Sequence, residues 1–225
     1  SNNGKYYIRT GSTVQELTSK NLADFLVRKT GMSWDNTIEE KADYESLDIS
    51  TIETFKALAL ERIPGIVQES DLFTLLTKLN LIENGKLKRA AVLLFGMDTQ
   101  RLYSHATVKI GKFLTDTDIQ STDIITGNIF KQLENTLETL RSKYLLSNIS
   151  FEGIRRRDRL EYPYEALREA IINALIHRDY NGFSQIMIKI YADKMIIMNE
   201  GGLPPEVPAE TLKKNHLSKP RNKLL

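Results

Sequence analysis

The stretch "EALREAIINALIHRDY", residues 165–180, decides the fold, because it combines the pattern of a buried helix with a regular series of polar side chains. It comes just after Pro163, and proline fits the first turn of a helix, where its missing N–H would be unpaired anyway. At about 3.6 residues per turn, the stretch presents one apolar face. That face consists of Leu167, Ile171, Ala174 and Leu175. We therefore expect a helix that packs this face into a core.

The same helix carries a polar residue at every fourth position, here called the polar ladder: Glu165, Glu169, Asn173 and His177. Residues four apart lie on one side of a helix, so Glu169 and Asn173 point the same way. Ile172 and Ile176 extend the apolar surface beside them, and a carboxylate is costly to bury without partners. Two interpretations stay open. Either backbone or an arginine satisfies the pair in a closed core, or the pair faces water, a metal ion or a ligand.

The composition excludes several classes of protein. With 41% hydrophobic and 27% charged residues among 225, the chain can bury a core in one large domain or two small ones. It has no cysteine, which excludes disulfides, a thiol nucleophile and thiolate metal sites. The longest clean apolar run, Ala90–Phe95, is far too short to span a bilayer, and we find no secretory signal. These features predict a cytoplasmic protein without a membrane segment.

The net charge of +2 conceals an uneven distribution. The chain is acidic from Asp35 to Glu53, and the first part of that stretch reads as a surface linker. It is basic in "RRRDR" at 155–159 and again from Lys213 to Lys223. Basic patches can bind phosphates or nucleic acid, and a solvated surface is the alternative interpretation. The candidate nucleic-acid contacts are Arg155, Arg156 and Arg157.

The rest of the chain mixes helices and strands without a regular β-α-β alternation, which predicts an α+β protein. Strands are expected at Tyr6–Ile8 before a turn at Gly11, over 106–114, as two short strands joined by a basic turn over 147–163, and as a pair over 184–200. Helices are expected at 19–29, from a cap at Ser50 to Arg62, and over 126–146. A further helix is expected in the stretch that begins at Glu69, and it should end at about Leu79. Asn84-Gly85 predicts a tight turn. A helix before a hairpin can be a winged-helix DNA reader or can simply pack.

Glu-x-x-x-Asn on a helix, then two strands and "MNEGGLPPEVP" at 198–208, resembles the Bergerat-fold (GHKL-like) ATPases, the group of gyrase and the histidine kinases. "EALREAIINALIHRDY", "IIMNEGGLP" and "KPRN" together resemble the RecG-like, AAA-4-associated transcriptional regulators. "YYIRTGSTV" resembles the end of the Schlafen/AlbA-type DNA-binding domain that precedes this module in such proteins. The resemblance covers most of the chain and is specific from about Tyr162 to Asn222.

The resemblance implies a division into three parts within a longer protein. Residues 1–34 are the remnant of the Schlafen/AlbA-type domain. Residues 35–100 form a helical connector with a wing-like hairpin. Residues 101–225 form a Bergerat-like module, an α/β sandwich of the histidine-kinase ATPase type that is truncated at its C-terminal end. The implied function is an ATP-binding switch in a DNA-binding transcriptional regulator, with ATP hydrolysis left open.

The resemblance also implies a role for individual residues. Asn173 would hold the Mg²⁺ that bridges the phosphates of ATP, since its amide oxygen is a hard ligand. Glu169 would be the catalytic base for water, and apolar flanks would raise its pKa. Asn199 stands where the group has an aspartate that accepts the adenine amino group, and Gly201 and Gly202 would let the loop lie against the base. The other nucleotide contacts would be His177, Arg178, Arg221 and Asn222, although packing at the helix end is the alternative for His177 and Arg178.

Two departures from the group keep a second function open. Asn199 replaces the aspartate, and no glycine follows Gly202 to close over the phosphates. The alternative is therefore a non-catalytic dimerisation or interaction module with a degenerate nucleotide pocket. A Walker motif is absent, which excludes a helicase motor, and the kinase reading of "HRD" fails because Ser184 stands where the catalytic loop needs asparagine. The expected partner is DNA, mainly through the missing N-terminal part, and a homodimer fits a regulator.

Overall fold

The computed structural model describes residues 5–10, 13–18, 22, 25, 33–145, 147–152, 155–202 and 220–225. Helices and strands are mixed along these residues, which confirms the α+β class. The expected turn at Gly11 and most of the expected helix over 19–29 lie outside them, although Leu22 and Phe25 are helical. None of the helices among them is long and apolar enough to cross a membrane.

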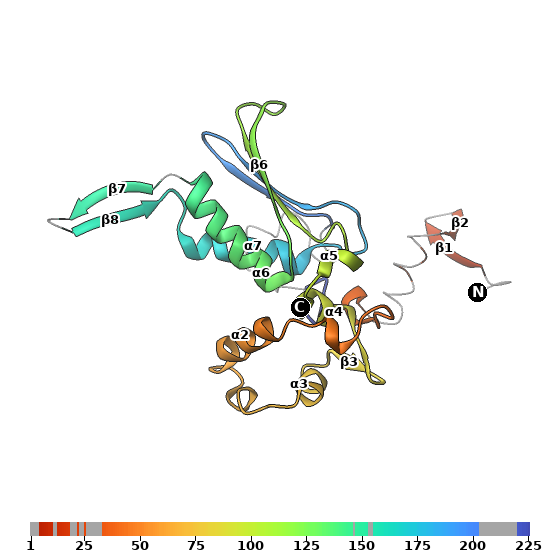
Figure 1. Ribbon diagram of the computed structural model, residues 1–225. Helices are drawn as coiled ribbons and strands as arrows, with labels where there is room; N and C mark the ends of the chain where they lie inside the picture. The colour runs from red at the N-terminus through yellow and green to blue at the C-terminus, as the bar shows by residue number, and fades with distance from the viewer. Residues whose placement is uncertain are drawn as a thin grey trace.

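A four-stranded sheet organises the C-terminal half, in the order β10-β9-β5-β6 (Figure 1). Its strands are β5 (Val108–Phe113), β6 (Ile119–Ile125), β9 (Ile186–Ile190) and β10 (Met195–Met198). β5 pairs in parallel with β9, whereas β5–β6 and β9–β10 are antiparallel. The predicted β5 and β9–β10 pair are therefore confirmed. β6 was not predicted, because its centre, "QSTD", is polar and lacks the alternation of a half-buried strand.

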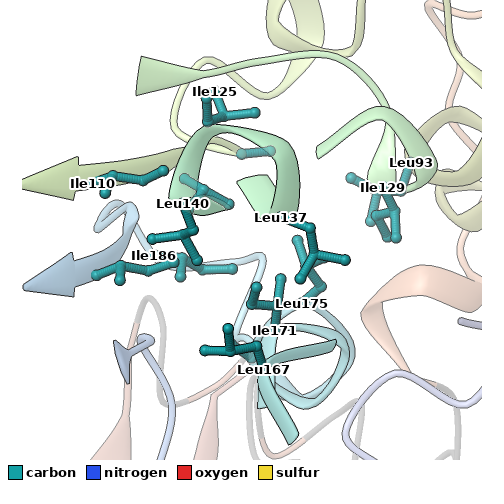
Figure 2. Close-up of a cluster of buried hydrophobic side chains, with 14 of the residues drawn as sticks. Leu93, Ile110, Ile125, Ile129, Leu137, Leu140, Leu167, Ile171, Leu175 and Ile186 are labelled. Carbon is teal, nitrogen blue, oxygen red and sulfur yellow. The ribbon is translucent and has the colours of Figure 1, made fainter. Parts of the chain in front are cut away.

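Two helices, α6 (Ile129–Thr139) and α7 (Tyr164–His177), pack together with this sheet around one core. Alternate residues of β5 and β9 are buried there, and Ile110 and Ile186 meet Leu137, Leu140 and Ile171 from the helices (Figure 2). Each such side chain contributes about 1.5–3 kcal/mol when fully buried. α6 continues into a π-helical turn, η4 (Leu140–Tyr144). Along the chain, α7 comes directly before β9 and β10.

Residues 47–95 surround a second core. Its elements are α2 (Ile49–Ala59), α3 (Leu72–Lys78), α4 (Arg89–Phe95) and the hairpin of β3 (Ile82–Glu83) and β4 (Lys86–Leu87). The hairpin turns at Asn84 and Gly85 with φ of 52° and 75°, the left-handed conformations of a type I′ turn, so the predicted turn is confirmed. Val92 and Leu93 of α4 belong to the first core while Phe95 belongs to the second, so α4 joins the two.

Two details of the N-terminal half differ from the expectation. The cap of α2 is Asp48 and not Ser50: the Asp48 carboxylate accepts the Ser50 N–H at 3.0 Å. Burial raises the pKa of Asp48, but hydrogen bonds from Lys131, Ser50 and Thr51 outweigh it and hold that pKa below its ordinary value. The acidic stretch is also not purely a surface linker, because Asp35 is buried and its Oδ2 accepts the Leu224 N–H at 2.6 Å.

Two further hairpins lie away from these cores in Figure 1. β1 (Tyr6–Thr10) pairs with β2 (Thr13–Leu17), and β7 (Ser147–Glu152) pairs with β8 (Arg155–Leu160). The strand expected at Tyr6–Ile8 and the two expected over 147–163 are confirmed, whereas β2 was not predicted. Arg155, Arg156 and Arg157 stand in β8 itself and not in the turn; their side chains lie outside what the structure describes. The remaining short elements are η1 (Trp34–Asn36), η2 (Tyr44–Ser46), η3 (Pro64–Ile66) and α5 (Thr99–Leu102).

Candidate functional site

The apolar face of α7 lies where its sequence predicts. Leu167, Ile171, Ala174 and Leu175 are all buried against the sheet and α6. The helix begins directly after Pro163, which occupies the N-cap position. The side of α7 that carries the polar ladder is therefore fixed by the burial of the opposite side.

The centre of the ladder is open to solvent. Glu169 and Asn173 are both exposed, and the Nδ2 of Asn173 donates to the Oε1 of Glu169 at 3.1 Å. The expectation of apolar flanks that shelter this carboxylate is wrong, because Ile172 and Ile176 are only half-buried and leave Glu169 in contact with water. Of the two interpretations of the pair, the structure therefore excludes a closed core and leaves a pair that faces water.

The C-terminal end of α7 is satisfied by side chains from three other segments. The last carbonyls of a helix have no partner within the helix. Asn199 Nδ2 donates to the Ala174 carbonyl at 3.0 Å, and Tyr180 Oη donates to the Leu175 carbonyl at 3.0 Å. Asn222 Nδ2 donates to the carbonyls of Ile176 at 2.7 Å and Arg178 at 2.8 Å. The three motifs singled out in the sequence thus converge on one helix end.

Arg178 lies at this end as a buried cation with carbonyl partners. Only 1% of it is exposed, and its Nη2 donates to the carbonyls of His105 at 2.6 Å and Ser184 at 2.8 Å. Its guanidinium also lies over the Tyr180 ring, 5.0 Å from the centroid. Burial lowers the pKa of Arg178 and raises that of Tyr180, so the Tyr180 hydroxyl stays protonated as a donor. These contacts support the packing interpretation of Arg178.

The loop after β10 is held against the turn after α7. The Asp179 N–H donates to the Glu200 carbonyl at 2.7 Å, and the Ser184 N–H donates to the Glu200 carboxylate at 2.7 Å. A Cβ on Gly182 would stand 2.1 Å from that carboxylate, so only glycine fits without a shift. Gly201 has a φ of +124°, a conformation that favours glycine, and a Cβ there would meet Arg221 and Asp179.

The remaining predicted contacts lie around this loop. The exposed Arg221 donates from Nη2 to the Gly202 carbonyl at 2.8 Å, and its Nη1 lies 3.7 Å from the Asp179 carboxylate. Gly202 is exposed, and no described residue would lie within 4 Å of a Cβ there, whereas His177 is half-buried at the end of α7. No group of three or more histidines, aspartates or glutamates that could hold a metal ion occurs among the described residues.

Sequence reasoning missed three residues of this arrangement: Tyr180, Gly182 and Glu200. Tyr180 was part of the "HRDY" motif but had no role, since its bond to the Leu175 carbonyl depends on the turn after α7. The Gly182–Glu200 contact joins residues 18 apart, and no local pattern signals it. A glycine directly after an asparagine is only a turn signal.

The comparisons with known proteins agree with part of this interpretation. A family model described as "Putative ATP-dependent DNA helicase recG C-terminal" matches residues 184–225, which include β9, β10 and the loop that follows. No curated protein matches the chain in sequence. The crystal structure of the DIP2311 protein from Corynebacterium diphtheriae is similar in fold, with a TM-score of 0.63 and 20% sequence identity over 96% of this chain. This chain spans 42% of that protein's length. The match over residues 184–225 supports a RecG-like, ATPase-related module at the C-terminal end of this chain.

Proposed function

We propose that this chain is part of a DNA-binding transcriptional regulator whose Bergerat-like α/β module binds ATP with Mg²⁺ as a switch. The observation that carries the proposal is the exposed Glu169–Asn173 pair, whose described hydrogen bond is to each other, so that both side chains remain accessible to a ligand. The loop of residues 199–202 is tied to the same helix next to Asn173, through Asn199 and the Ala174 carbonyl. A polar pair beside a glycine loop is an arrangement that could receive a nucleotide.

The chemistry of the pair fits this role. Because Nδ2 of Asn173 donates to Glu169, its amide oxygen remains available, and such an oxygen is a ligand that Mg²⁺ accepts. Mg²⁺ would neutralise phosphate charge when a nucleotide is bound. Glu169 would orient a water and accept its proton. In this proposal Asn199 faces the base, Gly201 and Gly202 line the loop, and His177 and Arg221 stand near the phosphates.

Two other polar residues of the three motifs, Asn222 and Arg178, take a positioning role in this proposal. Asn222 and Arg178 fix the end of α7 and the turn after it, and that helix presents Asn173. Their contacts with backbone carbonyls leave few donors for a nucleotide. They would affect nucleotide binding only by holding the helix and the loop in place.

The test is calorimetric titration of a non-hydrolysable ATP analogue into the chain, with and without Mg²⁺. We expect Mg²⁺-dependent binding that is lost in Asn173→Ala and kept in Glu165→Ala, an exposed residue about two turns earlier on the ladder. Equal binding by the Asn173→Ala variant would contradict the site. Absence of binding by both this chain and a longer form of the protein would contradict the function.

A second candidate function is a dimerisation module with a degenerate pocket. It is favoured by one observation: Asn199, which stands in place of the aspartate, already donates to a helix carbonyl. This candidate predicts no nucleotide binding and a concentration-dependent increase of mass in sedimentation. A monomer that binds the nucleotide would exclude it.

DNA contact through β8 is a separate proposal. The β7–β8 hairpin projects away from the cores in Figure 1, and Arg155, Arg156 and Arg157 follow one another along β8. Phosphate contacts lose affinity steeply with salt. We expect weak, salt-sensitive binding of duplex DNA that falls when the three arginines become serine. Binding unchanged by these substitutions would place the DNA contact elsewhere in the protein.

A further inference from the structure

A pocket of about 650 Å³ lies between η1, α5 and the turn after α7. None of its lining residues belongs to the polar ladder or to the loop of residues 199–202. Its volume falls within the range of about 300–1,000 Å³ that is typical of small-molecule sites. It is therefore a second candidate site, whose existence does not depend on the proposed nucleotide switch.

One wall of the pocket is a fixed aromatic group. Trp34 stacks on Tyr180 with ring centroids 5.8 Å apart and an interplanar angle of 19°, and it meets the edge of Tyr103 at 5.1 Å. The Arg89 guanidinium lies over the Trp34 ring, 4.8 Å from its centroid. Tyr103 and Tyr180 are buried, so these rings are held in place before any ligand arrives.

The rim of the pocket carries an aromatic ring that packing does not use. Phe183 is 85% exposed, and its only described ring contact is the edge of His105 at 5.7 Å. An apolar ring with so little cover lies open to a flat partner, and aromatic side chains of this kind are the platforms on which nucleobases stack.

The charges of the pocket favour an anion. Glu39 is the single carboxylate among the described lining residues, and it is already engaged: the Tyr103 hydroxyl donates to its Oε2 at 2.8 Å, and Arg89 Nε lies 3.7 Å from the same oxygen. Lys41 and Arg101 remain, both exposed, and no ion pair of either lies within the part of the chain that the structure describes. Lysine and arginine are the usual partners of phosphate groups.

We propose that this pocket binds a nucleotide, with the base stacked on Phe183 beside His105 and the phosphate between Lys41 and Arg101. The two recognised groups are a flat aromatic ring and a dianionic phosphate. A free mononucleotide and one nucleotide of a single DNA strand both present this chemistry. Binding needs no Mg²⁺, because the cations are supplied by the protein.

The chain reports occupancy of this pocket by itself, since Trp34 is its one tryptophan and lines the wall. The experiment is titration of the 225-residue chain with adenosine monophosphate in EDTA, followed by tryptophan fluorescence. Adenosine and inorganic phosphate are the matched probes that each lack one half of the ligand. We expect a saturable change with adenosine monophosphate, and weaker binding of both probes.

Substitutions locate the ligand. Arg101→Ala and Phe183→Ala should each weaken binding about tenfold, as expected for the loss of one charge-assisted contact or one stacked ring. Arg62→Ala, at an exposed arginine outside the pocket, should leave binding unchanged. Phe183→Tyr keeps the ring and should retain affinity, which separates stacking from general damage.

The outcomes distinguish this proposal from the nucleotide switch. Binding in EDTA that persists in Asn173→Ala assigns the signal to this pocket. No fluorescence change up to millimolar nucleotide would overturn the proposal, as would equal affinity for inorganic phosphate or unchanged binding in Arg101→Ala. A strand of eight deoxyadenosine nucleotides is the last ligand to compare. If it saturates the change in Trp34 fluorescence at a lower concentration than adenosine monophosphate does, the natural ligand is a DNA strand. If adenosine monophosphate saturates that change at the lower concentration, the natural ligand is a free nucleotide.

Discussion

The middle of α7 and its C-terminal end carry similar polar residues in opposite situations. At the C-terminal end, three side chains donate hydrogen bonds to carbonyls of the helix, namely those of Asn199, Tyr180 and Asn222. In the middle, Glu169 and Asn173 are exposed and bond to each other. Packing accounts for the first group and not for the second. The difference teaches that polar residues of one sequence motif can divide between those that complete a helix end and those that face water.

The largest expected effect is on the structural side of this comparison. Arg178→Met should lower the free energy of unfolding by about 3 kcal/mol, because it leaves the carbonyls of His105 and Ser184 buried without a donor. Urea unfolding followed by circular dichroism measures this loss. Arg62→Met, at an exposed arginine, is the control. A loss of unfolding free energy below about 1 kcal/mol would contradict a structural role for Arg178.

Asn222→Ala should cost about 2 kcal/mol, since two carbonyls at the end of α7 lose their shared donor. Asn222→Asp should cost at least as much, because a carboxylate cannot donate and is repelled by the negative end of the helix dipole. The same unfolding experiment measures both. Asn135→Ala, at an exposed position of α6, serves as the control. An equal loss of stability in that variant would contradict the claim that the bonds of Asn222 stabilise the end of α7.

Gly182→Ala should cost about 1 kcal/mol, because the new methyl group displaces the Glu200 carboxylate from the Ser184 N–H. The cost should shrink in a Glu200→Ala background, where that carboxylate is gone. A double-mutant cycle measures this coupling. Additive costs would mean that the methyl group acts on something other than Glu200.

The smallest expected effect on stability falls in the middle of α7. Asn173→Ala should change the free energy of unfolding by no more than about 0.5 kcal/mol, since the residue is exposed and bonds only to Glu169 among the described residues. Unfolding measured beside nucleotide titration sharpens the comparison: stability kept while Mg²⁺-dependent binding is lost assigns Asn173 to the site. A clear loss of stability would instead place it with the structural residues.

Local patterns predicted the elements that position the candidate site. The spacing of Leu167, Ile171, Ala174 and Leu175 gave the buried face of α7, and Asn84-Gly85 gave the hairpin turn. The polar ladder was placed on the correct side of the helix for the same reason. Its exposure was not predictable, because how far Ile172 and Ile176 shelter Glu169 depends on neighbouring elements and not on helical period.

Contacts between segments far apart in the chain could not be predicted from the sequence. The bonds of Asn222 to α7 span 46 and 44 residues, and nothing near Asn222 indicates its partner. The prediction of the residue that caps α2 was wrong for a different reason. Asp48 and Ser50 are both good capping residues two positions apart, and the choice of Asp48 involves Lys131 of α6, whose ammonium reaches its carboxylate.

The short segment of residues 220–225 bears on the order in which the chain assembles. Asn222 completes the end of α7, and the Leu224 N–H bonds to Asp35, 189 residues earlier. Both contacts therefore need this segment to return to parts of the chain that precede it by 46 and 189 residues. Contacts so far apart in sequence slow folding, because a long loop must close before they are gained. The contacts of residues 220–225 therefore belong to the slow, long-range part of folding.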